Sequence, residues 1–127
     1  MPDNGVVSDR YIVDDVAACV DFYVRCFGFA VGIASPAFAE VTRGNLRLLL
    51  SGPMSSAGRP MTDGAVPSAG GWNRLHMVVD DIGAEVARLG SLGVRFRNEM
   101  VSGPGGSQIL AMDPAGNLVE IFQSAAR

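Results

Sequence analysis

The chain has 127 residues, of which 48% are hydrophobic and 18% are charged, so it is long enough for one domain or for two small half-domains that share a core. The net charge is −3 and there is no basic block, which argues against a nucleic-acid partner. The apolar runs are only a few residues long, too short to span a bilayer, so no membrane partner is expected.

The N-terminus and the two cysteines both indicate the cellular compartment of the protein. Residues 1–5 are polar and lack the apolar core of a signal peptide. Cys19 and Cys26 lie in one predicted helix, about two turns or ~10 Å apart, which is too far for a disulfide. We therefore expect a cytoplasmic protein whose cysteines are reduced and partly buried.

The first half of the chain predicts one helix among four short strands. Asp14-Asp15 offers an N-cap, an apolar stripe with helical spacing follows, and Gly28 ends the helix. The helix is expected near residues 15–27, and the strands over 6–13, 29–33, 38–42 and 46–50.

Residues 51–71 are rich in Gly, Pro and Ser and have no hydrophobic period. A loop of this length in a compact domain is usually functional or disordered. We therefore divide the chain into a first module over 1–52, a linker or flap over 53–71 and a second module over 72–127, all within one structural domain.

The second half repeats the first. Asp81 lies 66 residues after Asp15 and opens a helix near residues 82–92, while Gly116-Asn117-Leu118 lies 72 residues after Gly44-Asn45-Leu46. The expected fold is α+β, with two βαβββ modules forming a curved, mostly antiparallel sheet around a cleft, the default site for a small ligand. The four strands of this half are expected over 74–79, 94–99, 107–112 and 118–123.

Glu120 is a carboxylate among apolar residues in the last predicted strand. Alternation along strands places Glu120 on one face, and Arg74 and His76 together on the uncovered face of their own strand. A charge in such surroundings must be paired, coordinated or open to a water-filled cleft. Glu120 therefore either forms a structural ion pair with Arg74 or belongs to a ligand site.

Five motifs resemble the vicinal oxygen chelate superfamily, which contains glyoxalase I, the extradiol dioxygenases, and the bleomycin and fosfomycin resistance proteins. The resemblance covers almost the whole chain and is specific for the fold, not for a reaction. It rests on residues 15–23, 27–29, 79–82, 103–106 and 113–123.

The resemblance implies metal-ligand positions at Ser8, Leu48, Arg74 and Glu120, of which only Glu120 is a ligand type. Zinc and iron sites need three or four protein ligands. The chain has one histidine, His76, so an iron site with two histidines and a carboxylate cannot form within one chain. No cofactor is expected, and Glu120 and His76 are the only candidates for a divalent metal or for catalysis.

The expected ligand is small, partly apolar and anionic, with Arg10, Arg74, His76 and Glu120 at its polar end. Trp72 either stacks on the ligand or anchors the core. The Gly-rich run 103–106 is interpreted as a hairpin turn, since no helix follows it to make a phosphate loop. The expected ligand-binding residues are Ser8, Arg10, Leu48, Trp72, Arg74, His76, Glu120 and Phe122.

Two functions remain open. The first is a glyoxalase- or bleomycin-resistance-like protein that binds a small organic molecule between the modules without metal. The alternative is a metal-dependent lyase or dioxygenase that uses Glu120, His76 and ligands from a partner subunit. The resemblance also implies a homodimer.

Overall fold

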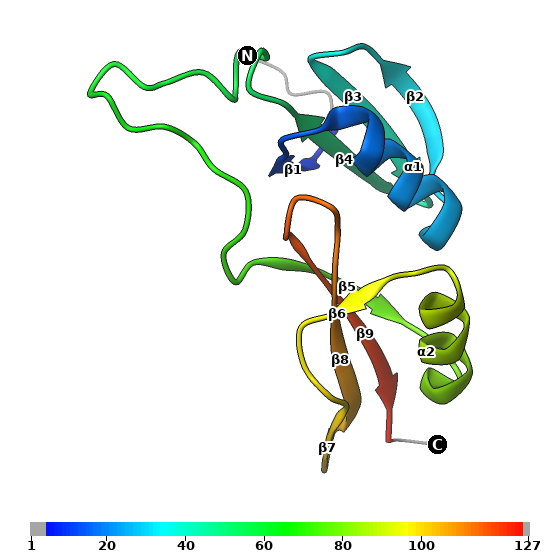
Figure 1. The fold of residues 1–127 in the computed structure, drawn as a ribbon. Helices are drawn as coiled ribbons and strands as arrows, with labels where there is room; N and C mark the ends of the chain where they lie inside the picture. The colour runs from blue at the N-terminus through cyan, green and yellow to red at the C-terminus, as the bar shows by residue number, and fades with distance from the viewer. Residues whose placement is uncertain (1–4, 126–127) are drawn as a thin grey trace. The chain divides into compact units, whose positions relative to one another are not determined.

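The computed structural model describes residues 5–125, so the polar residues 1–4 used for the compartment prediction lie outside it. The chain divides into two compact units, Met1–Ala69 and Gly70–Arg127, and Figure 1 shows the elements of each. In the described part of the chain no helix is long and apolar enough to cross a membrane.

The first unit is a four-stranded sheet with one helix on one face (Figure 1). The strand order is β1-β4-β3-β2, with β1 parallel to β4 and the other pairs antiparallel. The elements are β1 (Ser8–Ile12), α1 (Val16–Phe27), β2 (Ala30–Ala34), β3 (Phe38–Arg43) and β4 (Leu46–Ser51).

Helix α1 begins and ends where its capping residues predict. Asp15 accepts a hydrogen bond from the backbone N–H of Ala18 at 3.0 Å. Gly28 adopts the left-handed conformation with φ 69°, and its N–H donates back to the carbonyl of Val24. The helix buries Cys19, Tyr23 and other apolar side chains against the sheet. On the sheet side this core contains Tyr11, Ala39, Val41, Leu48 and Leu50.

The second unit repeats this plan with one strand more. Its sheet has the order β5-β9-β8-β6, β7 also pairs with β8, and only β5 and β9 are parallel. Asp81 caps α2 by accepting from the N–H of Ala84 at 3.0 Å, which confirms the repeat offset of 66. The elements are β5 (Arg74–Val78), α2 (Ile82–Ser91), β6 (Arg95–Phe96), β7 (Val101–Gly103), β8 (Gly106–Met112) and β9 (Leu118–Ser124).

The predicted α+β class is confirmed, with one change in the strand expected over 94–99. That segment is a two-residue strand, β6, and the chain re-forms a strand only at β7. The reason is Asn98, whose side-chain oxygen accepts the N–H of Leu110 at 2.9 Å and so replaces a backbone carbonyl in the ladder. The run 103–106 is a hairpin turn between β7 and β8, as interpreted.

Residues 52–73, between β4 and β5, contain turns but neither helix nor strand. Some of these turns are held locally. The hydroxyl of Ser55 donates to the carbonyl of Gly52 at 2.7 Å, and the N–H of Met61 donates to the carbonyl of Ala65 at 2.7 Å. The boundary between the two units falls at the end of this segment.

Candidate functional site

The face of the second sheet that points away from α2 carries Glu120. Val119 and Ile121 are fully buried on the face that α2 covers, so alternation along β9 turns Glu120 to the opposite face. The parallel register of β5 and β9 sets His76 beside Glu120 and Arg74 beside Leu118. Arg74, His76 and Glu120 therefore share one face, as alternation predicts.

Glu120 has a basic neighbour at each carboxylate oxygen. Arg74 donates from Nε to Oε1 at 3.1 Å, and His76 Nε2 lies 3.6 Å from Oε2. The ion pair expected between Arg74 and Glu120 is thus present. The second distance is too long for a hydrogen bond. The ring of His76 also lies against Phe122, with centroids 4.9 Å apart.

The Arg74–Glu120 pair affects whether Glu120 could bind a metal ion, as the superfamily resemblance implies. The side chain of Glu120 is only 10% exposed, and the guanidinium on its Oε1 already supplies the positive charge that a metal would bring. Within residues 5–125 no group of three His, Cys, Asp or Glu side chains could hold a metal ion. The described residues of this chain therefore do not by themselves supply the three or four ligands of the metal centre that the resemblance implies.

In the first unit, Ser8 and Arg10 lie on the exposed side of β1. Arg10 donates from Nη1 to the hydroxyl of Ser51 at 2.8 Å. On the same face, Arg47 and Glu40 form an ion pair at 2.7 Å. The hydrogen bond from Arg47 lowers the pKa of the Glu40 carboxyl.

Leu48 does not share the face of Ser8 and Arg10. The register of β1 and β4 sets Arg10 beside Leu49, whereas Leu48 is fully buried on the face that α1 covers. Because His76 lies beside Glu120 in the second sheet, the residue that corresponds to Glu120 is Leu49. Glu120 and Leu49 are 71 residues apart, so the offset of 72 taken from the Gly-Asn-Leu motifs differs from the strand register by one residue and selects Leu48 instead.

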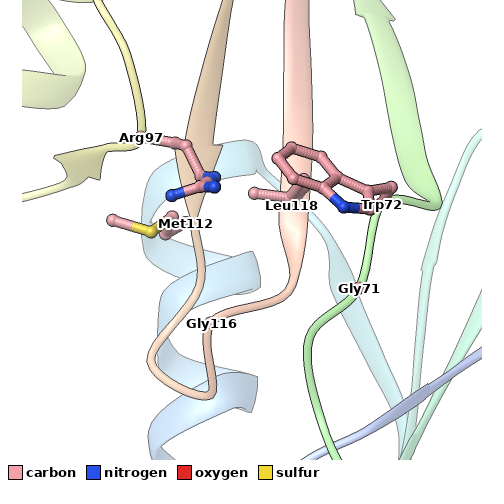
Figure 2. A pocket seen from close by; sticks show the side chains of 6 residues that line it. All are labelled: Gly71, Trp72, Arg97, Met112, Gly116 and Leu118. Carbon is pink, nitrogen blue, oxygen red and sulfur yellow. The ribbon is translucent and has the colours of Figure 1, made fainter.

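A pocket of about 270 Å³ lies on the same side of the second sheet as Glu120 (Figure 2). Figure 2 shows the side chains of Arg97 and Trp72 turned toward one another, with Leu118 between them and Met112 beside Arg97. The Cζ atom of Arg97 lies 4.8 Å from the centroid of the Trp72 ring, a cation–π distance. The lining residues are Gly71, Trp72, Arg97, Met112, Gly116 and Leu118.

Trp72 is 64% exposed, so of the two interpretations of this residue the core anchor is excluded. Its backbone is nevertheless held in place. The carbonyl of Trp72 accepts from Arg74 Nη1 at 3.5 Å, and two residues earlier the N–H of Gly70 donates to the Asn117 side chain at 2.9 Å. Asn117 in turn is bonded to the buried carboxylate of Asp113. The turn before β9 thus positions the tryptophan.

Arg97 is held from the other side of the pocket. Its backbone N–H donates to the carbonyl of Leu110 at 2.8 Å, and the next residue, Asn98, accepts from the N–H of Leu110. Two consecutive residues are thus tied to one position of β8. Sequence reasoning missed Arg97 as a site residue, although alternation along 94–99 would have turned it away from Val94 and Phe96.

The family model for the Glyoxalase/Bleomycin resistance protein/Dioxygenase superfamily matches residues 6–121. The chain therefore belongs to this superfamily, as its motifs indicate. A comparison with curated proteins found no match.

Solved structures with this fold include several superfamily proteins. The chain is 26% identical to a superfamily member from Sphaerobacter thermophilus, with a TM-score of 0.74 and coverage of 94% of this chain and 96% of that one. It is 25% identical to TnmS3, an antibiotic binding protein from a Streptomyces species, with a TM-score of 0.72 and coverage of 98% and 99%. It is 24% identical to a lactoylglutathione lyase from Agrobacterium tumefaciens, with a TM-score of 0.70 and coverage of 97% and 96%.

Proposed function

We propose that this protein binds a small, partly apolar organic molecule on the face of its second sheet that points away from α2, and does so without a metal ion. The observation that carries the proposal is the pocket between Trp72 and Arg97. It combines an exposed aromatic face, an apolar floor at Leu118 and Met112, and a cation at its edge, which is the usual composition of a small-molecule site. Its volume of about 270 Å³ suits a small ligand.

The state of Glu120 supports binding over metal-dependent catalysis. A carboxylate engaged by Arg74 at 3.1 Å must lose that partner before it can bind a metal, and breaking a poorly exposed ion pair is costly. The alternative, a lyase or dioxygenase that draws further ligands from a partner subunit to Glu120 and His76, needs this rearrangement. Binding at the pocket does not. The antibiotic-binding description of TnmS3, at 25% identity over nearly the whole of both chains, agrees with a binding role.

Trp72 is the only tryptophan of the chain, so its fluorescence reports on the pocket. We expect a panel of small aromatic compounds, screened by tryptophan emission and thermal shift, to contain compounds that change the emission and raise the melting temperature together. Calorimetry with Trp72→Leu should then show weaker binding of these compounds, because the aromatic stacking of the compound on the indole ring is lost.

A separate experiment tests whether binding is independent of metal. The aromatic compounds should bind with unchanged affinity after the protein is treated with a chelator, and the Glu120→Gln variant should still bind them. Binding that disappears on chelation and returns with a divalent metal would overturn the proposal in favour of the metal-dependent alternative.

A further inference from the structure

The cation at the pocket edge has no anionic partner of its own. Among the residues that the structure describes, no carboxylate lies within ion-pair distance of Arg97, Glu99 two residues later included. The guanidinium contacts the Trp72 ring, and none of its N–H groups finds an acceptor in residues 5–125. A guanidinium has five donors in a rigid fork that matches a carboxylate.

The neighbouring charges do not cancel this cation. Arg74 and Glu120 neutralise each other across their 3.1 Å contact, and the other residues that line the pocket are uncharged. The pocket therefore carries one surplus positive charge. The contact with the tryptophan orients the guanidinium before any ligand arrives, and the bonds of the Arg97 N–H and the Asn98 side chain to Leu110 fix the backbone that carries it, which lowers the ordering cost of binding.

We propose that Arg97 binds the carboxylate of an aromatic acid whose ring lies against Trp72 and Leu118. This assignment rests on the proposed function and names its ligand class. It moves the anion contact expected from the sequence away from Arg10 and Arg74, because Arg10 is bonded to Ser51 and Arg74 to Glu120. A charge-assisted hydrogen bond of about 1.5–3 kcal/mol corresponds to at least a ten-fold gain in affinity over a neutral ligand of the same shape.

Three probes that share one ring test the ligand class: benzoate, benzamide and benzylamine, titrated by calorimetry into the full chain. Benzoate should bind at least about ten-fold more tightly than benzamide, and benzylamine most weakly. Arg97→Gln should abolish the preference for benzoate over benzamide, whereas Arg97→Lys, which keeps the charge and loses the fork, should retain part of it. Arg59→Gln is the matched control, since it removes one positive charge at an exposed residue that does not line the pocket.

The outcomes separate this inference from the proposed function. If benzamide binds as tightly as benzoate, or if the preference survives in Arg97→Gln, the pocket binds aromatic molecules but the role of Arg97 is wrong. If Arg59→Gln abolishes the preference as fully as Arg97→Gln, the effect is one of net charge and the assignment is also wrong. If none of the three probes binds, the role assigned to Arg97 is wrong, and if no compound of the larger aromatic panel binds either, the proposed function is wrong as well.

Discussion

At the scale of single residues, the two members of the Arg74–Glu120 ion pair differ in how much stability is lost when each is left without the other. The side chain of Glu120 is 10% exposed and that of Arg74 is 33% exposed. A poorly exposed charge without a partner is costly, and the cost falls as water reaches the charge. The two halves of this ion pair should therefore respond differently to substitution.

We expect Arg74→Met to lower the free energy of unfolding by on the order of 2 kcal/mol and Glu120→Gln by only about 1 kcal/mol, because only the first leaves a nearly buried charge without its guanidinium partner. The double variant should be less destabilised than the sum of the two, since it leaves neither charge behind. Urea unfolding measures all three. Asp21→Asn is the control, because it removes an exposed i,i+4 pair with Arg25 and should change stability by less than about 0.5 kcal/mol. Equal losses for the two single variants would contradict the argument.

At the scale of secondary-structure elements, one side chain decides where β6 ends. Asn98 takes the place of a backbone carbonyl in the ladder to β8, so regular strand pairing stops next to Arg97, which lines the pocket. The geometry of the pocket edge therefore depends on a side chain outside it.

We expect Asn98→Ala to cost about 1 kcal/mol of stability, the typical value of a lost hydrogen bond, and to speed hydrogen exchange at the amide of Leu110. The same variant should weaken binding of aromatic ligands, because Arg97 loses part of its backbone support. Asn45→Ala, in the turn between β3 and β4, should change neither the exchange nor the binding. Unchanged exchange at Leu110 in Asn98→Ala would show that the bond is not important.

At the scale of the whole molecule, the edge strand β2 carries apolar side chains that are exposed to solvent. Val31 is 50% and Ile33 is 51% exposed, and β2 is the last strand of its sheet. An exposed edge strand with apolar side chains is a template for pairing with another chain. The homodimer implied by the superfamily resemblance stays a prediction, and this edge is where we place its test.

We expect light scattering to give a dimer at micromolar concentration, and Ile33→Lys to shift it toward monomer without unfolding the chain, since charged residues on an edge oppose strand pairing. Val66→Lys places the same charge at another exposed valine, 66% exposed in the segment before β5, and should leave the assembly unchanged. A monomeric wild-type protein would contradict the prediction.

The sequence by itself determined what depends on local pattern. Asp15 and Asp81 mark the starts of both helices, and alternation along β5 and β9 assigns Arg74, His76 and Glu120 to one face, because capping and strand periodicity act over a few residues. The ion pair between Arg74 and Glu120 followed from that shared face. The class of fold followed from the repeat of these local signals in the two halves.

Only the tertiary structure decided what depends on register and on contacts between distant residues. Leu48 lies on the helix-covered face because β1 and β4 pair with Arg10 beside Leu49, and a shift of one residue in register moves a side chain to the other face of a sheet. The pocket needs Trp72 and Arg97 side by side. Each is held by bonds to a different part of the β8–β9 hairpin, Trp72 through Asn117 and Arg97 through Leu110. No local pattern specifies those long-range contacts, because they form only when the strands pair.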